Sequence, residues 1–236
     1  MSNTRFFQLL SVSADAKTSK GEGEGFLTGI LYMAPSDQSG VINVCPHASA
    51  GCRAACLFSA GRGRFLNVIQ ARTKRTLFFA SDRKGFLARL STEISMLLVL
   101  AKAEGKTPAI RLNGTSDLPY ENFGIMQEFP TVQFYDYTKD GARYARYLMG
   151  KLPANYHLTF SRSETNGEMA ASFIKAGGNV AIVFAGKELP ATYNGAPVVN
   201  GDLNDLRFKD KRGVVVGLLA KGQAKKDESG FVVAVG

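Results

Sequence analysis

The sequence predicts an α/β fold: a partial (β/α) barrel or a wound, mostly parallel sheet with an N-terminal β-hairpin. Two observations carry this prediction. From Pro108 onwards, short runs of β-branched and aromatic residues alternate with helical patterns, which is typical of parallel βαβ units with right-handed crossovers. Earlier in the chain, residues 6–13 and 26–33 have the pattern of two strands. The glycine-rich stretch between them, residues 20–25, favours a turn.

The composition indicates a globular protein with a full core. The chain has 236 residues, of which 45% are hydrophobic, and this suffices to bury a core of ordinary size. No apolar run reaches the length of a membrane span, and no secretory signal pattern opens the sequence. We therefore expect a cytoplasmic protein with no membrane partner. We expect a single domain, residues 1–236, composed of a hairpin extension, a cysteine loop and βα repeats: 1–40, 41–64 and 108–226.

Two helices are expected after the cysteine loop. Residues 65–80 are rich in helix formers, and the next helix begins at the cap pair Ser81 and Asp82. Apolar residues then recur at intervals of three and four, which is typical of a packed helix with one apolar stripe. The stripe consists of Phe86, Leu90, Ile94, Leu97, Leu98 and Ala101.

The second half of the chain supplies the strands of the expected parallel sheet. These strand-like runs are 109–113, 132–138, 157–161, 180–185 and 213–219. Helical patterns separate the first four, at Tyr120–Glu128, Asp140–Gly150 and Thr165–Ala176. A charged turn and a last strand, residues 231–235, complete the pattern.

Polar residues follow the ends of these strands. In parallel α/β sheets, ligands bind at the carboxyl edge, where the loops from several units converge. Each residue alone is also compatible with a helix cap or a turn, but their joint position on one edge predicts a binding site. The candidate cofactor-binding residues are Asn113, Gly114, Ser116, Asp117, Ser161, Arg162, Glu164 and Asp202. No residue is assigned a catalytic role.

All three cysteines of the chain lie within one short segment. Cys45, Cys52 and Cys56 have the spacing C-x6-C-x3-C, and a helical turn over residues 49–58 would place the last two on one face. Three readings are open: three buried thiols, a zinc site completed by His47, or an iron–sulfur cluster. We favour a [4Fe-4S] cluster held by the three cysteines. One iron would then be left for another ligand.

Basic residues surround the cysteines. Their charge would stabilise thiolates and an anionic cluster, and the formal net charge of +9 could also attract nucleic acid or an acidic partner. A solvated basic surface explains the same residues equally well. They are Arg53, Arg62, Arg64, Arg72, Lys74 and Arg75.

Several segments together resemble a known family. "CPHASAGCRAAC", "RLNGTSD", "VQFYDYTKD", "LTFSRSE", "NVAIVFAG" and "VVNGDLNDLRFKDKRGVVVGLLAKG" are similar to the phage-encoded gene product 88-like family. The similarity covers residues 41–226. It implies a phage protein acting in the host cell, with a cluster held by cysteines.

A more distant similarity is to radical S-adenosylmethionine enzymes. Those enzymes carry a three-cysteine loop after the first strand of a partial barrel, and S-adenosylmethionine binds the unique iron of their cluster. The similarity implies that the loop at Asn113–Asp117 would meet the methionyl amine. Ser161 or Arg162 would meet the carboxylate or the ribose. The cysteine spacing differs from the C-x3-C-x2-C of that family, which affects cosubstrate binding more than cluster binding.

Three functions are consistent with these features. The first is a redox enzyme of the radical S-adenosylmethionine type, an oxidoreductase or lyase, favoured by the polar strand ends. The second is an electron-transfer or redox-sensing protein whose cluster takes a fourth ligand from His47 or Asp117, favoured by the unusual spacing. The third is a basic protein that binds nucleic acid or a host factor and contains a structural metal. Serine-nucleophile chemistry has no support, since no G-x-S-x-G motif is present.

Overall fold

The computed structural model describes residues 8–13, 23–56 and 61–235, apart from the side chain of Arg62. Three parts of the sequence-based predictions lie outside these ranges. They are the first residues of the predicted hairpin, the start of its turn, and the end of the predicted helical turn at the cysteines: 6–7, 20–22 and 57–58.

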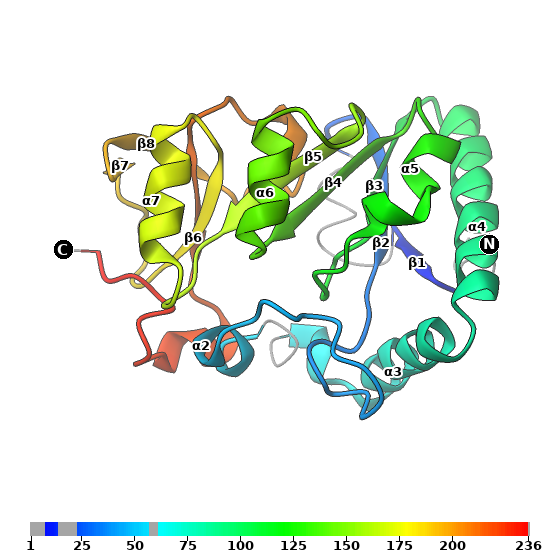
Figure 1. Cartoon of the computed structure of the whole chain (residues 1–236), viewed down its shortest axis with the longest axis horizontal. Coiled ribbons are helices and arrows are strands. Elements are labelled where there is room, and N and C mark those ends of the chain that lie inside the picture. Colours follow the sequence, from blue (N-terminus) through cyan, green and yellow to red (C-terminus); the bar gives the residue numbers. More distant parts are fainter. Residues whose placement is uncertain (1–7, 14–22, 57–60, 236) are drawn as a thin grey trace.

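Nine strands form one open sheet that does not close into a barrel (Figure 1). Their order is β1-β2-β3-β4-β5-β6-β9-β8-β7. All neighbours are parallel except the outermost pairs, β1 with β2 and β7 with β8. This confirms the predicted mostly parallel sheet with an N-terminal hairpin. The strands are β1 Leu10–Val12, β2 Phe26–Leu31, β3 Thr107–Arg111, β4 Gln133–Thr138, β5 Tyr156–Ser161, β6 Val180–Phe184, β7 Thr192–Tyr193, β8 Ala196–Asn200 and β9 Val215–Leu219.

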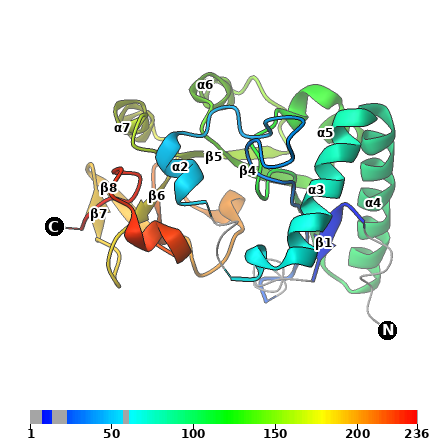
Figure 2. The same cartoon turned by 90° about the horizontal axis from the view of Figure 1, so that it is seen from below.

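Most helices pack on one face of this sheet. Figure 2 shows α5, α6 and α7 on one side of the strands and η5 on the other, and α4 packs against β2 and β3. The α-helices are α2 Ala50–Ala54, α3 Leu66–Ser81, α4 Arg83–Ala103, α5 Ile125–Glu128, α6 Gly141–Leu148 and α7 Gly167–Lys175. The 3-10 helices are η3 Gly61–Arg64, η4 Tyr120–Phe123, η5 Arg207–Lys209 and η6 Gly222–Lys226.

The main core lies between the sheet and these helices. The predicted stripe of α4 is buried there at every position except Leu98, which is partly buried. One charged residue of α4, Glu93, is also fully buried. Its carboxylate accepts hydrogen bonds from the backbone N–H groups of Leu9 and Leu10. Glu93 therefore anchors the short strand β1 against α4.

Two predicted elements differ from the structure. The single helix expected at Tyr120–Glu128 is divided into η4 and α5, because Gly124 between them adopts a φ of 79°, a conformation outside the helical region. The expected last strand is reduced to one bridge, between Val233 and Phe184. The charged segment before it forms η6 instead of a turn.

The connection between β2 and α3 brings the cysteines to the carboxyl edge of the sheet. Residues 32–56 and 61–65 run along the lower edge in Figure 1, beneath the ends of the parallel strands, and α2 lies within this connection. The 3-10 helix η6 lies beside α2 in both ribbon views. The predicted candidate residues of the strand-end loops face the same edge.

Candidate metal centre at the carboxyl edge of the sheet

Helix α2 carries Cys52 and is fixed at its N-terminus by a loop from β5. The Ser49 hydroxyl accepts from the Cys52 N–H, as an N-cap residue does. The Glu164 carboxylate accepts from the Ser49 hydroxyl and from the Gly51 N–H, both at 2.7 Å. Burial alone would raise the pKa of Glu164, but these hydrogen bonds outweigh it, and the pKa is lowered. Glu164 therefore acts as an ionised clamp on α2.

A residue larger than glycine at position 51 would force the Ser229 and Glu164 side chains to move. A Cβ atom there would lie 2.2 Å from the Ser229 hydroxyl and 2.8 Å from the Glu164 carboxylate. Three distant segments, around Gly51, Glu164 and Ser229, thus meet at the start of the cysteine helix.

The three cysteine side chains form no disulfide with one another and are partly buried. The Cys45 sulfur accepts a hydrogen bond from the Ser36 N–H at 3.3 Å, and the thiol lies 3.6 Å from the Thr115 carbonyl oxygen. Burial is the main cause that raises the pKa of Cys45 to about 12, and Cys56 and Cys52 raise it further. Cys45 therefore lies within electrostatic reach of both other thiols.

The surroundings of Cys52 carry both signs of charge. Burial is the largest cause that raises the pKa of this thiol. Lys139 lowers this pKa, and Glu164 and Asp117 raise it further. Arg53, which is exposed, also lowers the pKa.

Within the described ranges of the chain, no group of three or more His, Cys, Asp and Glu side chains is arranged to hold a metal ion.

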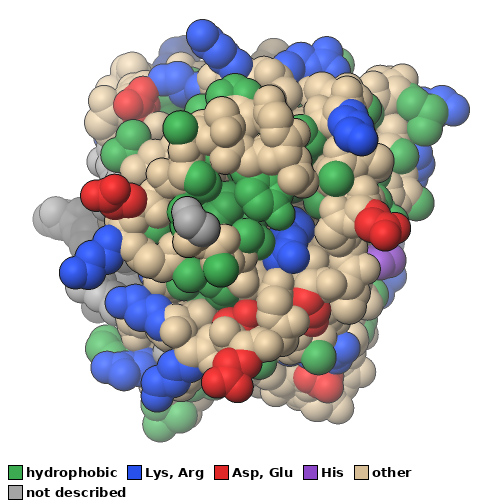
Figure 3. Space-filling model, turned by 90° about the vertical axis from the view of Figure 1, so that its left-hand side faces the viewer, with side chains coloured by type: hydrophobic (Ala, Val, Ile, Leu, Met, Phe, Trp, Pro, Cys, Tyr) green, Lys and Arg blue, Asp and Glu red, His purple; other side chains and the backbone are tan. Residues whose placement is uncertain are grey.

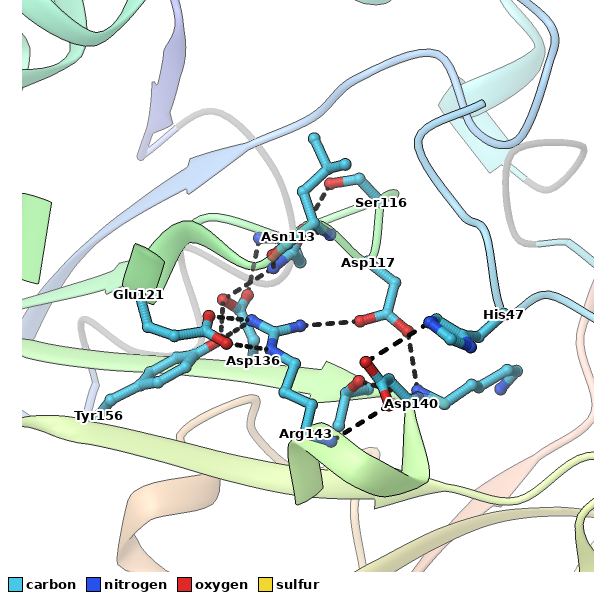
Figure 4. Close-up of polar contacts among 12 residues, drawn as sticks. His47, Asn113, Ser116, Asp117, Glu121, Asp136, Asp140, Arg143 and Tyr156 are labelled. Atoms are coloured by element: carbon cyan, nitrogen blue, oxygen red, sulfur yellow. Dashed lines mark hydrogen bonds and ion pairs between the residues drawn. The ribbon is translucent and has the colours of Figure 1, made fainter. Parts of the chain in front are cut away.

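The described contact of His47 is with a carboxylate. Its Nε2 atom lies 3.4 Å from the Asp140 carboxylate, and 46% of the side chain is exposed. Asp140 is the N-cap residue of α6, since its carboxylate accepts from the Arg143 N–H. Figure 4 shows His47 beside Asp140 and Asp117.

Asn113 organises the loop that follows β3. Its side-chain oxygen accepts from the Ser116 hydroxyl and the Leu118 N–H, both at 2.8 Å, and its amide donates to the Leu118 carbonyl. Gly114 is needed for close packing, because a Cβ atom there would approach Tyr32 to 2.6 Å. Asn113, Gly114 and Ser116 therefore shape the loop itself.

Asp117 joins this loop to α6. Its carboxylate accepts from the Lys139 N–H at 2.8 Å and pairs with Arg143 at 2.9 Å. The Arg143 guanidinium also forms a bidentate pair with Glu121 and donates to the Tyr156 hydroxyl. Figure 4 shows these side chains converging on Arg143.

Asp136 is the most deeply buried carboxylate of this network. It accepts from the Asn113 N–H at 2.7 Å and from the Tyr156 hydroxyl at 3.0 Å. Burial raises its pKa to about 7, although Arg143 and Arg111 oppose the change. The network thus couples the loop after β3 to the interior of the sheet.

Ser161 lies beside a lysine at the same edge. The Lys139 ammonium donates to the Ser161 hydroxyl at 2.5 Å and sits 5.4 Å from the centre of the Phe231 ring. Because Lys139 also lowers the pKa of Cys52, it links the β5 loop to the thiols.

With this geometry established, the comparisons identify the family. The chain matches the gene product 88 family over residues 8–235. It belongs to this family. No curated protein and no solved structure matches it. The match supports the phage gene-product family and does not test the more distant similarity to radical S-adenosylmethionine enzymes, which stays a prediction.

In this member of the gene product 88 family, Arg162 binds the C-terminal segment. Its guanidinium donates to the carbonyl oxygens of Gly230 and Phe231 at 2.6 and 3.0 Å. Phe231 belongs to a small apolar cluster with Ala55, Ala220 and Ala224, and Cys52 packs against this cluster. Arg162 therefore helps to enclose the cysteine helix.

Asp202 lies farther along the same edge, after β8. It accepts from the Leu219 N–H at 3.1 Å and pairs with Lys221 at 2.5 Å. Asp202 therefore fixes the ends of β8 and β9. In the sheet order, β6 and β9 separate β8 from β5.

The expected basic surroundings are only partly present. Arg72 lies over the Tyr32 ring at 5.3 Å, and Arg75 donates to the carbonyls of Gln8 and Tyr32. Burial, the largest cause, lowers the pKa of Arg75. These two arginines support β1 and β2, whereas Arg53 stands next to a thiol.

The site residues that sequence reasoning missed are buried polar side chains. Asp136 sits in the strand run "QFYDYT" at the same parity as Phe134 and Thr138, which face the helices. A carboxylate among positions that otherwise face the apolar core is the signal that could have revealed it.

None of the helices that the structure describes is long and apolar enough to span a membrane.

Proposed function

We propose that Cys45, Cys52 and Cys56 hold a [4Fe-4S] cluster, and that the protein is a redox enzyme of the radical S-adenosylmethionine type. The observation that carries the proposal is the position of the thiols. All three cysteines follow the first parallel strand, and Cys45 lies within electrostatic reach of Cys52 and Cys56. Parallel α/β sheets bind small molecules at this edge.

The chemistry of the thiols fits a cluster. Iron–sulfur clusters take cysteine thiolates as ligands, and hydrogen bonds to the sulfurs tune them; the Ser36 N–H supplies such a bond to Cys45. Because burial keeps Cys45 protonated without metal, iron binding would displace the proton. When bound, the cluster supplies single electrons.

The surrounding polar groups favour an iron left open for a small molecule. His47 is directed at Asp140, and Asp117 already accepts from Lys139 and pairs with Arg143. With three cysteines and four irons, one iron then lacks a protein ligand.

For the cosubstrate we assign Lys139 and Ser161 to the carboxylate. Their side chains are hydrogen-bonded to each other at the edge, and Lys139 is electrostatically coupled to Cys52. This assignment replaces Arg162, since the Arg162 guanidinium is held by two backbone carbonyls.

The test of the cluster is anaerobic reconstitution followed by iron, sulfide and electron paramagnetic resonance measurements. We expect a four-iron signal after reduction, and loss of iron in Cys45→Ala, Cys52→Ala and Cys56→Ala. His47→Ala is the matched control and should keep the full iron content. An iron-free, colourless protein after reconstitution would refute the proposal.

The test of the enzyme is the fate of S-adenosylmethionine. The reduced protein should cleave it to 5′-deoxyadenosine, and addition of the cosubstrate should change the resonance spectrum of the cluster. Lys139→Met should weaken cosubstrate binding without loss of iron. Normal iron content with neither binding nor cleavage of S-adenosylmethionine would support the cluster but exclude this enzyme class.

A second candidate is an electron-transfer or redox-sensing protein with a closed cluster. It is favoured by Asp117, whose charge raises the pKa of both Cys45 and Cys52. If Asp117 is the fourth ligand, Asp117→Asn should alter the spectrum of the reduced cluster in the absence of any cosubstrate. An unchanged spectrum in this variant argues for the enzyme.

A further inference from the structure

The face of the sheet opposite the helices carries an unusual set of buried polar side chains. Residues 201–212, with η5, cover this face, and η5 contacts β4 and β5. Most of the buried side-chain polar atoms that lack a hydrogen-bond partner in the described residues lie here. They belong to Thr28, Arg111, Tyr135, His157, Thr159, Arg207 and Asp210.

The strand register places these side chains side by side. Tyr135 pairs with His157, and Tyr137 pairs with Thr159 on the adjacent strand. Since side chains alternate between faces, residues directly paired in a parallel sheet share a face. Tyr135 packs with Leu206 of the covering segment, which identifies this face as the one beneath residues 201–212.

Two arginines border this polar face. The Arg111 guanidinium pairs with Asp205 at 2.7 Å and lies 4.7 Å from the centre of the Tyr137 ring. Arg207 enters from the covering segment and lies 3.2 Å from Asp210. Burial raises the pKa of Tyr137, Asp205 raises it further, and Arg207 and Arg111 lower it. The Tyr137 phenol is therefore near both arginines.

These polar atoms are unusual for the interior of a protein. A buried donor or acceptor without a partner costs about 1–3 kcal/mol, and native proteins contain few of them. The opposite face of the same sheet is packed with apolar side chains such as Phe134, Leu158 and Phe160. The face beneath residues 201–212 instead carries arginine, tyrosine and threonine groups that can hydrogen-bond to a bound ligand.

The atoms without a hydrogen-bond partner indicate which class of ligand this face could bind. The Nε atoms of Arg111 and Arg207 lack a hydrogen-bond partner, and a guanidinium can only donate. The other Arg207 nitrogens are engaged, because Nη1 pairs with Asp210 and Nη2 donates to Asn204. The hydroxyls of Tyr135 and Thr159 can donate as well. A ligand with several acceptor oxygens satisfies this arrangement, and the geometry of guanidinium groups suits carboxylate and phosphate.

We propose that the polar face beneath residues 201–212 is a binding site for an oxyanion, a phosphate or carboxylate group, held by Arg111, Arg207 and the hydroxyls of Tyr135 and Thr159. Tyr137, at the border of this face, is partly exposed and packs against the cluster of Ala181, Val214 and Val216. It uses none of the cysteines, and it does not depend on the proposed cluster.

The experiment measures anion binding by the full-length protein as purified and after anaerobic reconstitution. Inorganic phosphate and sodium acetate are titrated separately at constant ionic strength, with sodium chloride as the reference. Calorimetry and the melting temperature are the readouts. Saturable binding and a rise in melting temperature with phosphate alone identify a phosphate site, and the same result with acetate identifies a carboxylate site. No saturable response to either anion overturns the proposal.

Two near-isosteric variants make the test independent of folding. Tyr135→Phe and Thr159→Val each remove one hydroxyl that has no partner. They should raise the melting temperature of the ligand-free protein, because an unsatisfied polar group is lost. They should also weaken anion binding by about tenfold or more, the effect of a hydrogen bond to a charged group.

The matched control lies on the helix side. The Tyr144 hydroxyl donates to the Asn179 carbonyl at 2.8 Å, so Tyr144→Phe should lower the melting temperature and leave anion binding unchanged. Equal binding by Tyr135→Phe, Thr159→Val and the unmodified protein would place the anion elsewhere and refute the site. Water alone in this space would be indicated if no anion binds and both variants fail to gain stability.

Discussion

At the scale of single residues, the most informative side chains are those that connect segments far apart in the sequence. Glu164 follows β5, yet it holds Ser49 and Gly51 at the start of α2. The sequence indicated Glu164 as a member of a ligand site, whereas its described contacts position the cysteine helix. A single sequence gives no information on such a partner, because the hydrogen bond spans more than a hundred residues.

The first prediction concerns this clamp. Glu164→Gln should lower the free energy of unfolding by about 1 kcal/mol, a value typical of the loss of a helix cap on a partly exposed site. It should also increase the rate at which Cys52 reacts with iodoacetamide in the metal-free protein. Glu168→Gln, in the first turn of α7, is the control. Equal alkylation rates in both variants would contradict the assigned role.

The second prediction concerns Asp136. Folding raises its pKa from 3.8 to about 7, so the folded state retains a proton that the unfolded state releases. The resulting stabilisation is complete below pH 3.8 and is lost as the pH rises to about 7, with a total of at most about 4 kcal/mol.

The measurement is denaturant unfolding between pH 5 and pH 8. Asp136→Asn cannot titrate, and its stability should vary less with pH in this range than that of the unmodified protein. Glu128→Gln, at an exposed position, should keep the original pH dependence. An unchanged slope in Asp136→Asn would show that Asp136 is ionised throughout.

At the scale of elements, the regular parts of the fold could be predicted and the irregular parts could not. The stripe of α4 and the alternating strands follow from periodicities that the core imposes directly. The break at Gly124 and the short strands β7 and β8 depend on contacts with neighbouring segments. For the site, the cysteines could be found from their isolation in the sequence, whereas Arg143 and Asp136 depend on contacts between different strands and helices.

The third prediction concerns the segment that encloses α2. Phe231 is 8% exposed and belongs to the small apolar cluster against which Cys52 packs. Phe231→Ala should lower the free energy of unfolding by about 3 kcal/mol, near the lower limit for such truncations. A reconstituted protein with this change should also lose iron faster in air. Val235→Ala, at a position that is 41% exposed, should behave like the unmodified protein in both assays.

At the scale of the whole molecule, the excess of positive charge is distributed and does not form one continuous surface in the view that Figure 3 gives. That view of the β7 and β8 end shows hydrophobic side chains at the centre and basic ones around the margin. A hollow at this end is lined in part by Ala185, Lys187, Glu188 and Val235. Such a distribution favours weak, non-specific attraction to polyanions.

The fourth prediction tests nucleic-acid binding. With a net charge of +9, the protein should be retained on double-stranded DNA at low salt and released below about 200 mM salt, because phosphate contacts weaken steeply with ionic strength. Retention should not depend on the DNA sequence. Sequence-selective retention above that salt concentration would favour the third function, a nucleic-acid-binding protein.

The enclosure of Cys52 by Phe231 has a consequence for biosynthesis. The ribosome makes the three cysteines long before it makes residues 220–235, which complete the wall around α2. Until those residues emerge, the nascent chain presents its thiols without that cover. If the protein binds the proposed cluster, we therefore expect iron to enter more readily during translation. A chain that ends near residue 219 should then take up the cluster faster and lose it sooner.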